Sequence, residues 1–170
     1  MDKLTQHIFL IGFMGAGKST IAAKLQEMLD VKQMEMDQII VEQQKMPITE
    51  IFEKYGEAHF RDIESQLLID LKNEAPGIVS CGGGIVVREE NPGYMKESGK
   101  IVFLTATPET IYERVKDSTE RPILNGNMNV EYIRELMEKR RAKYEAAADI
   151  IVATDGKSAE EICSEILAQM

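Results

Sequence analysis

The chain reads Gly12-Phe13-Met14-Gly15-Ala16-Gly17-Lys18-Ser19-Thr20 near its start, and this stretch fills every required position of the pattern G-x-x-x-x-G-K-[ST]. Its glycines allow the backbone to curl so that N–H groups point inward at phosphate oxygens. Lys18 can reach the outer phosphates, and the Ser19 hydroxyl can bind Mg²⁺. The stretch therefore predicts a P-loop that holds a nucleoside triphosphate.

The residues on either side of this loop have the pattern that a phosphate site requires. The segment His7-Ile8-Phe9-Leu10-Ile11 is typical of a buried strand, and residues 19–30 carry apolar side chains at helical spacing. A helix that starts at the loop directs the positive end of its dipole at bound phosphates. The alternative is a chance glycine-rich turn, which this order of strand, loop and helix disfavours.

Short apolar runs alternate with helical patterns along the rest of the chain. The runs lie at residues 8–11, 77–81, 101–104 and 150–153. A further, weaker strand is expected to end near Met36. The alternation is typical of an α/β fold with a parallel sheet, here of five strands with flanking helices. A length of 170 residues suits a single domain that spans residues 1–170 and buries its own core.

The formal net charge of −9 narrows the class of partners. A nucleic-acid partner would need an extended basic face, so we expect no nucleic acid, and a negatively charged substrate must meet local arginines. Cys81 and Cys163 form no C-x-x-C pair and predict neither a disulfide framework nor a metal site. This cysteine usage favours the cytoplasm, and the absence of a leader or a long apolar run predicts no export and no membrane partner.

The segment from Lys116 to Asn129 is polar and rich in Asn and Gly. It follows a helix expected to start at Thr107-Pro108-Glu109, where a capping residue precedes a proline and an acidic residue. A helix containing Tyr132 and Tyr144 comes after it. In a phosphate-binding enzyme, such a polar segment is a candidate lid.

Two acidic residues help to choose among the classes of P-loop protein. Neither apolar run 77–81 nor 101–104 ends in the Asp that holds magnesium in many P-loop ATPases, and no Asn-Lys-x-Asp sequence occurs. Glu35 and Asp37 instead lie at the end of the second predicted strand, where alternation would place both on one face near the P-loop. One could organise Mg²⁺ through water while the other orients an acceptor hydroxyl. Alternatively, both could cap the helix that starts near Asp37.

Further motifs follow the P-loop in order. They are Phe60-Arg61-Asp62-Ile63-Glu64 on a long helix, Gly82-Gly83-Gly84 after the third strand, Arg121-Pro122-Ile123-Leu124 in the polar segment, and Arg140 four residues before Tyr144. Each motif is weak alone, but their joint occurrence behind a P-loop is specific. With them, the chain resembles the shikimate kinase family over nearly its full length.

This resemblance implies a P-loop NTPase fold of the nucleoside-monophosphate-kinase type. Such a fold has a five-stranded parallel sheet, a substrate-binding region at about residues 37–64 and a lid at about residues 116–129. The implied reaction moves the γ-phosphoryl group of ATP, with Mg²⁺, to the 3-hydroxyl of shikimate in chorismate and aromatic amino-acid biosynthesis. The expected form is a cytoplasmic monomer.

The resemblance also assigns roles residue by residue. The catalytic residues would be Lys18, Asp37 and Arg121. The ATP contacts would be Gly15, Ala16, Gly17, Lys18, Ser19, Thr20, Arg121 and, against the adenine, Arg114. The substrate contacts would be Asp37, Arg61, Gly83 and Arg140. The metal would lie at Ser19 and Glu35; the family usually has Asp at the latter position, and the extra methylene of Glu35 changes its reach.

The chemistry of these residues fits the assigned roles. The planar fork of arginine suits bidentate capture of a carboxylate such as that of shikimate. Backbone at Gly83 can approach a ring closely because no side chain intervenes. Whether Asp37 abstracts a proton or only orients the hydroxyl stays open. The structural alternatives are an ion pair of Arg61 with Glu57 or Glu64, a solvated face that includes Arg140, a flexible turn at Gly82–Gly84 and a surface charge at Arg121.

Two other functions compete with this interpretation. One is a kinase for another small metabolite, such as gluconate, and acceptor-dependent rates would separate the two. The other is a nucleotide-binding regulator that keeps the P-loop but transfers no phosphoryl group.

Overall fold

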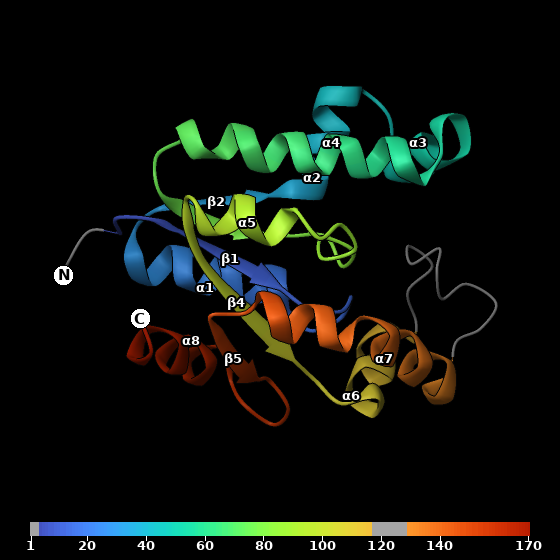
Figure 1. Ribbon diagram of the computed structural model, residues 1–170. Helices are drawn as coiled ribbons and strands as arrows, with labels where there is room; N and C mark the ends of the chain where they lie inside the picture. The colour runs from blue at the N-terminus through green and yellow to red at the C-terminus, as the bar shows by residue number, and fades with distance from the viewer. Residues whose placement is uncertain (1–3, 117–128) are drawn as a thin grey trace.

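The computed structural model describes residues 4–116 and 129–170. They form a five-stranded sheet with parallel pairing and the strand order β2-β3-β1-β4-β5 (Figure 1). The strands are β1 (His7–Ile11), β2 (Lys32–Glu35), β3 (Gly77–Ser80), β4 (Gly99–Thr105) and β5 (Ile150–Ala153). The α/β class and the five parallel strands predicted from the sequence are confirmed.

Helices cover both faces of this sheet (Figure 1). The main covering helices are α1 (Lys18–Leu29) and α8 (Ala159–Ala168) on one face, and α4 (Glu57–Asp70) and α5 (Asn91–Lys96) on the other. Along β1, Ile8 and Leu10 pack into the first cluster, whereas Phe9 and Ile11 pack into the second. The strand is apolar throughout because both of its faces are buried.

The P-loop connects β1 to α1. Gly17 directly precedes the helix with φ of 98°, a left-handed conformation that glycine adopts without steric cost. Because α1 begins at Lys18, its N-terminal N–H groups lie at the loop. The predicted order of strand, loop and helix is confirmed.

Three helices follow β2 and pack against one another at the top of Figure 1. They are α2 (Met36–Gln44), α3 (Ile48–Tyr55) and α4. The prediction that strand alternation places Glu35 and Asp37 on one face is wrong. Glu35 is the last residue of β2, and Asp37 lies in the first turn of α2, where the helix dipole favours a negative charge.

The 3-10 helix η1 (Leu71–Asn73) leads to β3, and β4 continues into α6 (Pro108–Val115). The Thr107 side chain accepts a hydrogen bond from the Thr110 N–H, which confirms the predicted start of α6. The next helix is α7 (Val130–Ala147), capped by Asn129. Arg121 and most of the predicted lid at residues 116–129 lie outside the described residues.

The last helix runs back along the sheet. The C-terminus therefore lies beside the amino ends of the strands (Figure 1). Among the described helices, none combines the length and the apolar character that a bilayer span requires.

Candidate active site

A cavity of about 380 Å³ lies at the carboxyl ends of the central strands. Ligands of parallel α/β sheets bind at this edge. The predicted site residues in its wall are Gly15, Gly17, Lys18, Ser19, Thr20, Glu35, Asp37, Gly83 and Arg114. Ala16 differs from its neighbours because its side chain is buried in the core and its N–H donates to the Phe13 carbonyl at 3.1 Å.

The Lys18 ammonium is directed at the backbone of its own loop. Its Nζ donates to the Gly12 carbonyl at 2.6 Å and to the Phe13 carbonyl at 3.2 Å. These contacts keep a positive charge at the cavity wall, where phosphates of a nucleotide would need one.

Ser19 and Glu35 lie together, as the predicted metal site requires. The Ser19 hydroxyl donates to Glu35 Oε2 at 3.1 Å, and the Gln33 amide donates to Glu35 Oε1 at 2.7 Å. Hydroxyl and carboxylate oxygens suit Mg²⁺, which usually keeps several waters and uses few protein ligands. The donor set therefore fits the metal.

The Gly82–Gly84 turn leaves room for charged side chains on its outer surface. A Cβ atom at Gly82 would lie 2.9 Å from Asp37 Oδ1 and 3.1 Å from Glu64 Oε2. A Cβ atom at Gly84 would overlap the terminal nitrogens of Arg61. The absence of side chains at this turn is what allows two carboxylates and a guanidinium to reach it.

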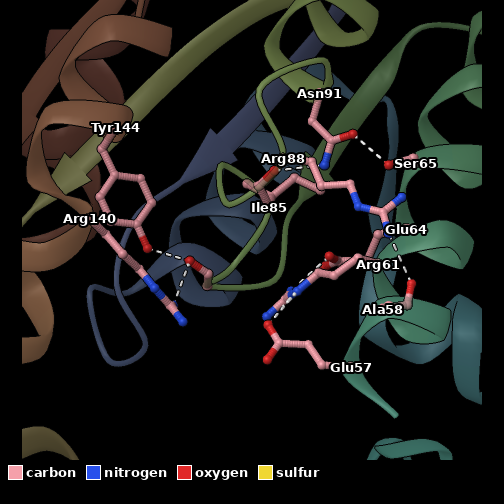
Figure 2. Close-up of polar contacts among 11 residues, drawn as sticks. Glu57, Ala58, Arg61, Glu64, Ser65, Ile85, Arg88, Asn91, Arg140 and Tyr144 are labelled. Atoms are coloured by element: carbon pink, nitrogen blue, oxygen red, sulfur yellow. Dashed lines mark hydrogen bonds and ion pairs between the residues drawn. The ribbon is translucent and has the colours of Figure 1, made fainter. Parts of the chain in front are cut away.

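Arg61 is a buried cation held by two carboxylates of its own helix. It is 7% exposed, donates to Glu64 Oε1 at 2.8 Å through Nη1 and to Glu57 Oε2 at 3.2 Å through Nε. Figure 2 shows these contacts. The alternative that Arg61 pairs within α4 is thus observed. Because these pairs fix its guanidinium beside Gly84, they are compatible with a role in binding.

Glu64 is fully buried. Burial raises the pKa of its carboxyl and nearby Asp37 raises it further, whereas Arg61 acts to lower it. Within the described residues, Glu64 Oε2 has no hydrogen-bond partner. This unpartnered oxygen and the Asp37 carboxylate both lie beside Gly82, so two carboxyl groups face the glycine turn at one point.

Arg140 reaches the same turn from α7 on the other side. Its Nη1 donates to the Gly83 carbonyl at 3.2 Å, and the Tyr144 hydroxyl donates to the same oxygen (Figure 2). Neither Arg61 nor Arg140 belongs to the cavity wall, but each guanidinium lies against the turn that does. The structure therefore brings both arginines to the edge of the cavity that Asp37 and Lys18 line.

Arg114 lies against the P-loop. Its Nη1 donates to the Gly15 carbonyl at 2.9 Å and to the Thr154 hydroxyl at 3.3 Å. These contacts place a planar cation at the cavity wall between the P-loop and the turn after β5.

Comparison with known proteins agrees with this geometry. The family model for shikimate kinase matches residues 14–170. The chain belongs to the shikimate kinase family. The shikimate kinase of Persephonella marina is 40% identical over 165 residues, which cover 97% of this chain and 99% of the relative. That of Enterococcus faecalis is 42% identical over 168 residues, which cover 97% and 98%.

Solved structures give the same result. A shikimate kinase from Acinetobacter baumannii in complex with shikimate has a TM-score of 0.90 and 29% identity, with 97% of this chain and 92% of that chain covered. A gluconokinase from Sinorhizobium meliloti has a TM-score of 0.63 at 18% identity, covering 99% of this chain and 93% of that chain. The second likeness shows the fold alone.

Two residues of this shikimate kinase family member received no role in the sequence analysis. Glu64 follows Arg61 by one helical turn, and Tyr144 follows Arg140 by one turn. Both spacings are visible in the sequence, but burial against the glycine turn is a tertiary property. Cys81 lines the cavity as a buried thiol whose pKa is raised by burial.

Proposed function

We propose that this cavity transfers the γ-phosphoryl group of ATP to the 3-hydroxyl of shikimate, giving 3-phosphoshikimate and ADP. One observation carries the proposal: Lys18 and Asp37 line one cavity, and two arginines lie at the glycine turn on its edge. This set offers cationic groups for two anions and a carboxylate for an alcohol.

The P-loop is the proposed ATP site. Backbone N–H groups from Gly15 to Thr20 and the start of α1 would bind the phosphates, and Lys18 would neutralise the outer ones. Arg114 would stack against the adenine. Ser19, with Glu35 acting through water, would hold Mg²⁺, which supplies charge neutralisation at the phosphates.

Shikimate is the proposed occupant of the side of the cavity facing α4 and α7. Its carboxylate would meet the guanidinium groups of Arg61 and Arg140 and the backbone of Gly83. Asp37 would accept a hydrogen bond from the 3-hydroxyl. In this arrangement the carboxylate end and the reacting hydroxyl are held by different elements, which fixes the direction of the ring.

In the reaction, the 3-hydroxyl oxygen forms a bond to the γ-phosphorus as the bond from that phosphorus to the β,γ-bridging oxygen breaks. The hydroxyl proton leaves toward Asp37 or solvent, and ADP departs with the bridging oxygen. Positioning and charge neutralisation supply most of the rate in such transfers. Lys18 and Arg121 are the proposed neutralising cations, and the role of Arg121 and of a lid at residues 116–129 is still a prediction from the sequence.

A coupled assay for ADP release tests the function. The protein, with Mg²⁺ and ATP, is expected to release ADP at a rate that depends on shikimate and not on gluconate. In Lys18→Met, turnover should fall by about a hundredfold or more because a cation at the transferred phosphate is lost. Circular dichroism of the variant should match that of the original protein. ADP release that responds to gluconate alone, or to no acceptor, would reject the proposal.

We further propose that the chain works as a single-domain, cytoplasmic monomer that binds neither nucleic acid nor membranes. The net charge of −9 supports the expectation of no nucleic-acid partner, because a molecule with excess negative charge repels a polyanion.

A further inference from the structure

Tyr144 is a buried phenol on the side of α7 that packs against β4. It is 2% exposed, and its ring stacks on Phe103 of β4 with centroids 4.9 Å apart and an interplanar angle of 23°. Only its hydroxyl leaves this apolar packing, and it donates to the Gly83 carbonyl (Figure 2). A buried tyrosine hydroxyl needs such a partner, so the ring and the hydroxyl together fix one position of the glycine turn.

The Gly83 carbonyl also accepts from Arg140 at 3.2 Å. One backbone oxygen therefore receives donors from two residues that lie one turn apart on α7. Burial raises the pKa of Tyr144, although nearby Arg140 acts to lower it, so the hydroxyl keeps its proton at neutral pH. The hydroxyl is therefore a hydrogen-bond donor at neutral pH.

Other contacts hold the neighbours of Gly83: the Ile85 N–H donates to the Gly82 carbonyl at 3.1 Å, and the buried Asn91 amide donates to the Ile85 carbonyl at 2.8 Å (Figure 2). Two further contacts lie beyond them. Lys143 donates to the Val87 carbonyl at 3.3 Å, and Arg88 donates to the Ala58 carbonyl at 3.0 Å. Both hold the segment that follows the glycines. The side-chain hydrogen bonds to the Gly83 carbonyl come from Arg140 and Tyr144, so the orientation of its peptide depends in part on the contacts with α7.

We propose that Tyr144 is a positioning residue for the carboxylate of shikimate: it holds the Gly83 peptide and, through the shared carbonyl, the Arg140 guanidinium in the binding geometry. The inference rests on the proposed function. It assigns Tyr144 no contact with substrate. Loss of the Tyr144 hydroxyl should weaken the binding of shikimate. It should change the binding of ATP little, because the P-loop lies on other elements.

The test is Tyr144→Phe, which removes the hydroxyl and keeps the ring that stacks on Phe103. We expect the KM for shikimate to rise about three- to tenfold, which corresponds to the loss of one hydrogen bond. The KM for ATP and kcat should change less than twofold. The midpoint of thermal unfolding should stay within a few degrees, because the Gly83 carbonyl keeps Arg140 as a donor.

Tyr94→Phe is the matched control, because Tyr94 of α5 packs against the same core cluster and, within the described residues, its side chain makes no hydrogen bond to the glycine turn. It should leave the KM for shikimate unchanged. Direct titration of shikimate by calorimetry on the same variants gives a readout that does not depend on turnover. A lowered unfolding midpoint in Tyr144→Phe with an unchanged shikimate KM and affinity would overturn the proposal and leave a structural role alone. Failure of the original protein to phosphorylate shikimate would instead reject the proposed function.

Discussion

At Arg61, a structural ion pair and the proposed binding role are compatible. Burying an unpaired cation is energetically unfavourable. Two carboxylates on the same helix pair with the guanidinium, which offsets this penalty and fixes the orientation of the side chain. The guanidinium then needs little further ordering to receive a planar anion. Its ion pairs and its proposed role in binding are therefore parts of one arrangement.

For Arg61→Lys we expect the KM for shikimate to rise about tenfold or more, because an ammonium cannot reproduce a bidentate fork held by Glu57 and Glu64. Turnover at saturating shikimate should change less. Steady-state kinetics measure both. Arg141→Lys is the matched control, since Arg141 is exposed and pairs only with neighbours on its own helix among the described residues. A shikimate KM for Arg61→Lys equal to that of the control would contradict the role.

The sequence alone could place Arg61 on a helix with Glu57 and Glu64 within one turn, but it could not choose between an ion pair and a binding group. The choice depends on burial against Gly84, which lies after a different strand. The P-loop was easier to predict because its ligand contacts are made by consecutive backbone groups. A local sequence pattern is enough to predict such a site. A site built by side chains from distant parts of the chain can be recognised only once the fold is known.

Among the secondary-structure elements, the presence of each strand is predicted better than the residue at which the strand ends. Four apolar runs became strands with nearly the expected bounds. In β1 and β3 every residue is buried, whereas β5 buries only alternate residues. Strand β2 ends at Glu35, one residue before the expected end near Met36, and α2 begins at Met36. Even so, Glu35 and Asp37 line one cavity, because a strand end and a helix start both face the carboxyl edge of the sheet.

Asp155 joins the turn after β5 to the start of α6. Its Oδ1 accepts from the Thr107 N–H at 3.0 Å and from the Thr107 hydroxyl at 3.3 Å. Burial acts to raise the pKa of Asp155, but the hydrogen bonds from Thr107 and Thr110 outweigh it, so the net pKa is lowered. A lowered pKa in the folded state means that the carboxylate stabilises the fold above the ordinary value of 3.8 and loses this effect as pH falls below it.

Asp155→Asn should therefore lower the free energy of unfolding by up to about 1 kcal/mol at pH 7, a value kept small by the partial exposure of the group. The difference should shrink as the pH is lowered toward about 3, where the original carboxylate also becomes protonated. Urea denaturation across this range measures both quantities. Glu89→Gln, an exposed change with the same loss of charge, controls for net charge. A difference that grows on acidification would contradict the assignment.

Viewed as a whole, the molecule combines an acidic surface with few exposed apolar groups. Within the described residues, the exposed large hydrophobic side chains are Tyr55, Ile151 and Met170, and they belong to α3, β5 and the chain end. Figure 1 shows α3 at the top of the view and β5, an edge strand of the sheet, at the bottom. Scattered apolar side chains of this kind do not make a stable interface.

We therefore expect sedimentation velocity to give one species with a mass near 19.1 kDa over a wide range of protein concentration. Added shikimate and ATP with Mg²⁺ should leave this mass unchanged. Since a stable dimer needs a contiguous buried area, a mass that doubles at micromolar concentration would show that a surface not recognised from these side chains takes part.

The return of α8 along the sheet has a practical result. Met170 ends the chain beside the amino ends of the strands, whereas the ligand cavity opens at the carboxyl ends. A biotin or a fluorescent protein attached after Met170 would lie on the opposite side of the molecule from the cavity. The enzyme could then be tethered to a sensor surface with its working edge turned toward the flowing solution.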